Sequence, residues 1–234
     1  MGIPVYLAMT AAEIYSCRQL PHKLAYMACH FSAYGTGLSN LPQWLPPQAI
    51  VIINDRIPPV KHNRQQILSQ LNELCRHLNP SGLLLDFQRS DPCLDALAKL
   101  LVNELPCPIA VTELYAKDLS CPVFLRPAPA YLSIAEHIRN WPGRDIWLDV
   151  APIACSFTID EQESRYCEDP DLHARCPFYD QKRFVRYGIS QNGNNFIFSL
   201  VRDADDSLKM LSTAPPSIKC ALGLYQQLGM YRPG

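Results

Sequence analysis

The chain has 234 residues, 48% of them hydrophobic and 18% charged, which is enough to bury a sizeable core in one large domain or two small ones. Its formal net charge is −1, so no long-range electrostatic field attracts nucleic acid or an anionic membrane surface. We therefore expect neither nucleic acid nor a membrane among its partners.

The N-terminal stretch MGIPVYLAMTAAEIYS lacks the basic segment of a signal peptide, and Glu13 interrupts its short apolar run. The run is also too short to span a bilayer. The sequence therefore predicts a cytoplasmic protein without a membrane anchor.

Short apolar runs rich in β-branched residues recur along the chain, and most are continuous rather than alternating. This pattern is typical of parallel strands that are covered on both faces. Eight such runs predict strands at 3–9, 24–30, 49–54, 82–88, 108–113, 122–126, 145–150 and 195–201.

Helix patterns lie between several of these strands. The helix at 91–105 begins with Asp91 as N-cap and Pro92 at the first helical position, and Gly229 is a plausible C-cap for the last one. The apolar periodicity predicts helices at 63–78, 91–105, 131–141 and 217–229.

Eight strands with intervening helices predict an α/β fold, a compact (β/α)8 TIM-like barrel formed by 1–234 as a single domain. The segment 151–194 is poor in helix signals and contains Asn192-Gly193, a hairpin signal, so we interpret it as an elaborated loop and hairpin before the last strand. An open doubly wound sheet is the alternative. The sequence lacks the Gly-x-Gly-x-x-Gly or Walker-type turn that is typical of nucleotide-binding open sheets, and we predict no cofactor.

The ten cysteines are expected to be reduced thiols in a protein that is not exported. Those in apolar runs, Cys29, Cys121 and Cys155, behave as small hydrophobic residues. The group with the best metal-ligand spacing is Cys167, His173 and Cys176, but it lacks a fourth ligand and a Cys-x-x-Cys pair. We predict no metal site.

In a (β/α)8 barrel the functional groups gather at the carboxyl ends of the strands. Polar residues follow the predicted strands at these ends, whereas Pro4, Leu24, Pro108 and Pro122 lie at the opposite ends. The candidate substrate-binding residues are His30, Asp55, Arg56, Gln88, Arg89, Tyr115 and Arg126.

Three carboxylates, Asp86, Glu113 and Asp149, directly follow apolar residues and are the candidate catalytic groups. A carboxyl group at the edge of a core has a raised proton affinity and can act as a general acid. Two such groups are what glycoside hydrolysis requires. The alternative is a structural ion network with the arginines that follow neighbouring strands.

The segment 81–88 reads SGLLLDFQ and resembles the fourth-strand signature of the chitinase-like family of glycoside hydrolases, Asp-Gly-x-Asp-x-Asp-x-Glu. Gly82 matches the glycine, Asp86 matches the last aspartate, and Phe87 stands where that family often has an aromatic residue. Ser81 and Leu84 replace the two earlier aspartates, and Gln88 replaces the catalytic glutamate.

The resemblance implies a (β/α)8 barrel and a carbohydrate ligand. In that family the glutamate donates a proton, the acetamido group of the substrate attacks, and the aspartate orients this group. Asp86 keeps the orienting role in this comparison, whereas Gln88 cannot act as the acid, so Glu113 or Asp149 would have to supply one.

The leading hypothesis is a glycoside hydrolase-like barrel that acts on or binds a carbohydrate. One alternative is a catalytically inactive barrel of the same shape that binds a ligand or partner. Another is a hydrolase or lyase of an anionic small molecule, which Arg56, Arg89 and Arg126 would suit.

Overall fold

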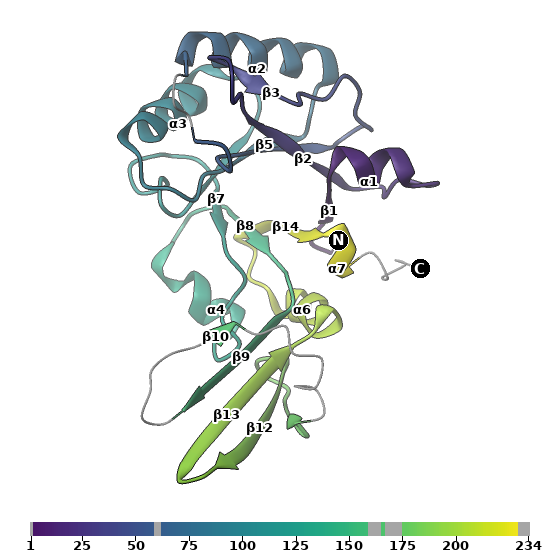
Figure 1. Cartoon of the computed structure of the whole chain (residues 1–234), viewed down its shortest axis with the longest axis vertical. Coiled ribbons are helices and arrows are strands. Elements are labelled where there is room, and N and C mark those ends of the chain that lie inside the picture. Colours follow the sequence, from purple (N-terminus) through teal and green to yellow (C-terminus); the bar gives the residue numbers. More distant parts are fainter. Residues whose placement is uncertain (1, 59–61, 159–164, 167–174, 229–234) are drawn as a thin grey trace.

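Eight parallel strands close into a barrel in the computed structural model of this chain, which describes residues 2–58, 62–158, 165–166 and 175–228 (Figure 1). The strands follow one another in the order β1-β14-β8-β7-β6-β5-β4-β2, and β1 also pairs with β2, which completes the ring. The predicted (β/α)8 barrel is thereby confirmed. Its strands are β1 (Val5–Met9), β2 (Leu24–Phe31), β4 (Ile50–Asn54), β5 (Gly82–Asp86), β6 (Ile109–Thr112), β7 (Val123–Leu125), β8 (Ile146–Asp149) and β14 (Ile218–Leu224).

The barrel has two apolar layers because side chains alternate between its inner and outer face. The inner layer fills the barrel, and the outer layer lies between the strands and the helices. The inner layer consists of Tyr6, Ala8, Ala25, Ile50, Ile52, Leu84, Ala110, Phe124, Trp147, Cys220 and Leu222. Strands buried on both faces explain why the sequence runs are continuously apolar.

Gly82 at the start of β5 makes room for the largest of these inner side chains. A Cβ atom at this position would lie 2.8 Å from Cη2 of Trp147 and 2.9 Å from the carbonyl oxygen of Pro108. Both separations are closer than van der Waals contact allows. The glycine at this position is therefore required by the indole ring of Trp147 and by the chain entering β6.

Two long helices cover one side of the barrel. In α2 (Arg64–Leu78) the side chain of Asn63 accepts hydrogen bonds from the N–H groups of Gln65 and Gln66, and in α3 (Pro92–Glu104) Asp91 accepts from Cys93. These side chains satisfy amide groups that have no partner within the helix. Both predicted helices are confirmed.

The rest of the helical ring is incomplete. Short helices α1 (Ala11–Ser16), α4 (Ile134–His137) and the 3-10 turn η1 (Ile138–Asn140) flank β2 and β8. The connection from β2 to β4 carries the short antiparallel strand β3 (Leu38–Ser39). Turns alone connect β6 to β7 in the described residues. The barrel therefore closes although the ring of helices around it is incomplete.

A second sheet is inserted between β8 and β14, below the barrel in the view of Figure 1. Its antiparallel strands lie in the order β10-β9-β13-β12-β11. Their bounds are β9 (Ile153–Thr158), β10 (Arg165–Tyr166), β11 (Phe178–Asp180), β12 (Val185–Asn192) and β13 (Asn195–Arg202).

Two sequence predictions about the end of the chain are wrong. The predicted eighth barrel strand, 195–201, is β13 of the second sheet, paired with β12 through the expected Asn192-Gly193 hairpin. The predicted helix 217–229 is instead β14, which closes the barrel, followed by the short α7 (Tyr225–Leu228). Short apolar runs fit helix and strand equally well, and here pairing with β1 and β8 decides. The C-cap predicted at Gly229 lies outside the described residues.

Arg202 connects the second sheet to the barrel. Its side chain is only 1% exposed, and its guanidinium donates to the carbonyl oxygens of Ala128 (2.6 Å), Leu132 (3.0 Å) and Arg183 (3.0 Å). Burial lowers the pKa of this guanidinium to about 10. The hydrogen bonds to carbonyl oxygens compensate for the lost hydration of the charge. After Arg202 the chain forms α6 (Ala204–Met210) and η2 (Leu211–Thr213).

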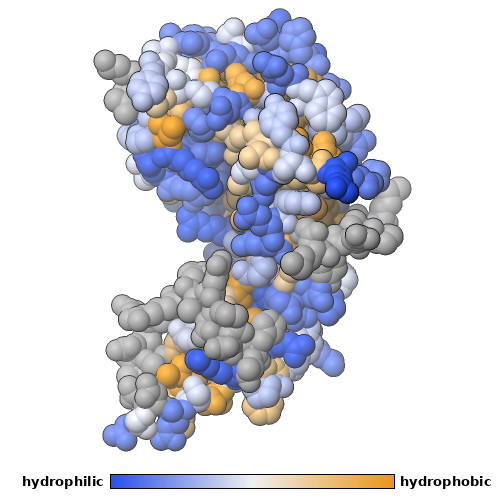
Figure 2. Space-filling model, turned by 45° about the vertical axis from the view of Figure 1, so that its right-hand side comes forward, coloured by the Kyte–Doolittle hydropathy of each residue, from blue (hydrophilic) through white to orange (hydrophobic). Residues whose placement is uncertain are grey.

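The second sheet exposes apolar side chains, and orange atoms appear on the surface in the lower part of Figure 2. Phe178 and Ile189 are each 55% exposed, and Phe196 is 47% exposed. The cross-strand pair of Phe178 and Tyr187 has ring centroids 5.4 Å apart.

Candidate functional site

A pocket of about 310 Å³ opens at the carboxyl ends of the barrel strands, within the range of small-ligand sites. We call it the mouth pocket. Its apolar floor is the top of the inner layer, with Phe124 and Leu222 among its residues, and polar side chains surround it. The polar residues are Asn54, Arg56, Asp86, Gln88, Arg126 and Asp149.

Strand β5 delivers the residues that the sequence singled out. Leu84 lies in the inner layer, so Asp86 and Gln88, two and four positions later, face the same way and line the mouth pocket. The Gln88 side-chain amide donates a short hydrogen bond to Oδ1 of Asp86. Its oxygen accepts a 2.6 Å hydrogen bond from Nη2 of Arg126. Gln88 is thus held between an anion and a cation.

The two carboxylates of the pocket have raised proton affinities. Burial raises the pKa of Asp149 to about 6, partly offset by the Ala151 N–H, which donates to Oδ1 at 2.9 Å, while the charge of Asp86 raises it further. Burial also raises the pKa of Asp86, and its hydrogen bond from Gln88 opposes this. Near pH 6 the pocket therefore contains a carboxyl group that exchanges a proton with solvent.

Arg56 lies in the loop after β4 and lines the pocket. Its positive charge opposes the rise in the pKa of Asp86. Its backbone N–H donates to Oδ1 of Asn54 at 3.2 Å. The pocket thus combines two guanidinium groups with two carboxyl groups, a set suited to several hydrogen bonds with one polar ligand.

Five of the ten predicted site residues do not line the mouth pocket. Three of them hold the loop after β5. Asp55 is buried and accepts from the N–H groups of Gln88 (3.1 Å) and Arg89 (2.9 Å). The hydroxyl of Tyr115 donates to the carbonyl oxygen of Arg89 and accepts from the N–H of Asp91. Arg89 itself is exposed and donates to the carbonyl oxygen of Arg56.

The other two lie further from the pocket. His30 faces β3, where Nε2 is 3.1 Å from Nδ2 of Asn40 and Nδ1 is 2.8 Å from the carbonyl oxygen of Phe31. Glu113 is exposed in the turn after β6 and interacts electrostatically with His137. The structure therefore brings together Asp86 and Asp149 but places Glu113 elsewhere.

Several lining residues were absent from the sequence prediction. Asn54 is buried, and its side-chain amide donates to the carbonyl oxygen of Cys29 at 3.0 Å. Phe124 forms part of the floor, and Leu222–Leu224 line the wall from β14. Alternation from an inner-layer residue identifies Asn54 and Phe124, whereas the contribution of β14 was hidden by the wrong helix prediction.

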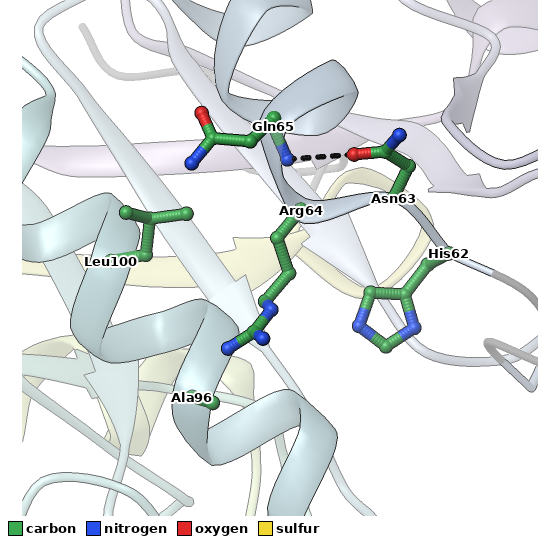
Figure 3. A pocket seen from close by; sticks show the side chains of 6 residues that line it. All are labelled: His62, Asn63, Arg64, Gln65, Ala96 and Leu100. Atoms are coloured by element: carbon green, nitrogen blue, oxygen red, sulfur yellow. Dashed lines mark hydrogen bonds between the residues drawn. The ribbon is translucent and has the colours of Figure 1, made fainter.

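A second, larger hollow of about 680 Å³ lies on the outer surface, between the start of α2 and the middle of α3 (Figure 3). Its residues include His62, Arg64 and Ala96. The first N–H groups of α2 already have a partner in Asn63, and no carboxylate contributes to the lining. Because it lies outside the barrel and no inner-layer residue lines it, we place the candidate site at the mouth pocket.

The described residues contain no group of three or more His, Cys, Asp or Glu side chains arranged to hold a metal ion. Cys176 is buried and lies 3.5 Å from the carbonyl oxygen of Ser199, and the other two members of the predicted cluster, Cys167 and His173, lie outside the described residues. None of the described helices is long and apolar enough to cross a membrane.

The fold and pocket define a (β/α)8 barrel with a polar site at the carboxyl ends of its strands. Neither a protein-family model nor a curated protein matches the sequence, but solved structures share the fold. The Bacillus cereus spore cortex-lytic enzyme SleL superimposes with a TM-score of 0.57 at 10% identity, covering 94% of this chain and 70% of that chain. Human YKL-39, a pseudo-chitinase with retained chitooligosaccharide binding properties, gives 0.50 at 12% identity, covering 94% and 92%.

These similarities confirm the predicted resemblance to glycoside hydrolase barrels at the level of the fold.

Proposed function

We propose that the mouth pocket binds a carbohydrate and does not cleave it by the acid-catalysed route of the chitinase-like family. The observation that carries the proposal is the position of Gln88. It stands where that family has its proton donor, faces the pocket, and is held by Asp86 and Arg126. A carboxamide has no acidic proton to transfer to a leaving oxygen.

The composition of the pocket supports a sugar as ligand. Carboxylate, carboxamide and guanidinium groups around the pocket can each accept or donate hydrogen bonds to hydroxyl groups. The apolar floor at Phe124 and Leu222 suits the C–H face of a pyranose ring. We take chitooligosaccharides as the first class to test because YKL-39, which shares the fold, retains binding to them.

The test is calorimetric titration of the full chain with chitooligosaccharides of increasing length. We expect binding, and a loss of about tenfold or more in affinity for Arg126→Ala, because a hydrogen bond to a charged group is removed. Arg76→Ala is the matched control, since Arg76 is exposed on the outer surface of α2. Absence of binding, or equal losses in both variants, would contradict the proposal.

A second candidate is a hydrolase in which Asp149 is the general acid. The pKa of about 6 at Asp149 favours it, because an acid of this strength is half protonated near pH 6 and can donate a proton there. A panel of aryl glycosides distinguishes the two candidates. Activity in the wild type that Asp149→Asn abolishes and Glu113→Gln preserves would establish the hydrolase and overturn the binding-only proposal.

A further inference from the structure

Two cysteines meet on the side of the barrel opposite the mouth pocket. The Sγ atoms of Cys75 and Cys107 are 3.3 Å apart. Cys75 lies in the last turn of α2, and Cys107 lies between α3 and β6, two residues before Ile109. Both positions adjoin the amino ends of strands. Within the described residues, no other two thiols come within hydrogen-bonding distance.

The backbone on both sides of the pair is held in place. The carbonyl oxygen of Cys75 accepts from the N–H of Asn79, the left-handed residue that ends α2. Cys107 stands between two prolines, whose rings fix the backbone torsion φ, and the carbonyl oxygen of Pro108 accepts from the N–H of Leu83 in β5. The two sulfur atoms are therefore kept together by the fold.

The two thiols differ in access and acidity. Cys75 is buried, whereas Cys107 is partly exposed. The hydrogen bond from the thiol of Cys75 lowers the pKa of Cys107 and raises that of Cys75. Cys107 is therefore the thiol that solvent-borne reagents reach first and the better nucleophile at neutral pH.

We propose that Cys75 and Cys107 form a reversible intramolecular disulfide when the chain meets a low-molecular-weight disulfide such as glutathione disulfide. The sulfur atoms need to approach from 3.3 Å to about 2.05 Å, and the chain between them closes into a ring. That ring contains β5 and α3 and carries Asp86 and Gln88 of the mouth pocket. The proposal does not depend on the proposed function.

The exchange takes place in two steps. The Cys107 thiolate attacks one sulfur of glutathione disulfide, whose S–S bond breaks and releases one glutathione thiolate. Cys75 then loses its proton, and its thiolate attacks Sγ of Cys107 and displaces the second glutathione. The two protein thiols are oxidised by two electrons in all, and glutathione disulfide is reduced to two glutathione thiols.

The test uses the full chain, equilibrated with reduced glutathione or with glutathione disulfide, alkylated, and analysed by peptide mass spectrometry. The expected result is a peptide pair linked through Cys75 and Cys107 in the oxidised sample alone. Oxidation should also raise Tm by about 5–10 °C, since a disulfide constrains the unfolded chain. This readout on the wild type requires no variant to fold.

Variants make the assignment specific. Cys107→Ser should abolish both the linked peptide and the Tm shift. Cys93→Ser should keep them, because Cys93 is exposed on α3 within the same ring but has no thiol neighbour among the described residues. Full alkylation of Cys75 and Cys107 after oxidation, or a Tm shift that survives Cys107→Ser, would overturn the proposal.

Discussion

Nη2 of Arg126 lies 2.6 Å from Oε1 of Gln88, so the carboxamide of Gln88 accepts a charge-assisted hydrogen bond from a cation. Its amide nitrogen donates to Asp86 at the same time. Both hydrogen-bonding ends of the carboxamide are therefore occupied, by Asp86 at the end of β5 and by Arg126 after β7. A carboxylate in its place would keep Arg126 as partner but would have to share a proton with Asp86.

Gln88→Glu should therefore introduce hydrolysis. Asp86 already lines the pocket beside this position, and a positioned general acid contributes about 10²-fold or more to such a reaction. The measurement is the release of reducing ends from a bound chitooligosaccharide, with Gln88→Ala as control at background rate. A Gln88→Glu variant that binds the ligand but stays at background would show that the remaining groups are not placed for this chemistry.

Asp149→Asn should stabilise the protein near neutral pH. Burial raises the pKa of Asp149 from 3.8 to about 6 in the folded chain. Between these values the folded state holds a proton that the unfolded state has released, so stability falls as pH rises through this window. The ionised group then costs about 2–3 kcal/mol at pH 7. Asparagine keeps an oxygen for the Ala151 N–H.

Urea unfolding at several pH values between about 4 and 7 checks this. The variant should gain stability over the wild type as pH rises, with little difference at the acid end. Glu113→Gln is the control, because Glu113 is exposed. A stability difference that does not change with pH would contradict the burial of Asp149.

Arg202→Met should lower the free energy of unfolding by about 3 kcal/mol or more, since three carbonyl oxygens lose their charged donor. Arg139→Met is the matched control at an exposed position.

Because Arg202 joins the second sheet to the barrel, we also expect the wild type to unfold in one transition. Tryptophan fluorescence reports on the barrel through Trp147, and far-UV circular dichroism reports on both sheets. Separate midpoints would contradict a single domain.

Gly82→Ala should destabilise the barrel by about 1–3 kcal/mol, the usual effect of overpacking a core. The added methyl group would meet Trp147 and the backbone of Pro108 at the distances given above. Gly2→Ala is the control, because a Cβ there meets nothing within 4 Å. Thermal unfolding of both variants measures the difference, and an unchanged Tm for Gly82→Ala would mean that Trp147 is not packed as described.

Alternation along the strands explains which site residues could be predicted from the sequence. Asp86 follows Leu84 and Asp149 follows Trp147, both in the inner layer, so both carboxylates face the pocket. Asp55 is offset by one position from the inward row that ends at Asn54, and it turns to the loop amides instead. A polar residue at a strand end therefore does not by itself predict a pocket residue, because the direction of its side chain must also be known.

The parts that could not be predicted depend on long-range pairing. The run 195–201 is as apolar as a barrel strand, but its hairpin partner keeps it in the second sheet. The run 218–224 shows no clear strand period, and its pairing with β1 and β8 makes it the closing strand. A local sequence pattern contains no information about a contact between residues as far apart in the sequence as Val5 and Ala221.

That contact has a consequence for how the chain folds during synthesis. β1 is made first, but the neighbour on its open side, β14, leaves the ribosome only after the whole inserted sheet. Until then the edges of β1 and β8 have unpaired amide and carbonyl groups, which can pair with other chains. Closure of the barrel is thus a late, non-local step, and nascent chains that end before β14 should depend on chaperones to remain monomeric.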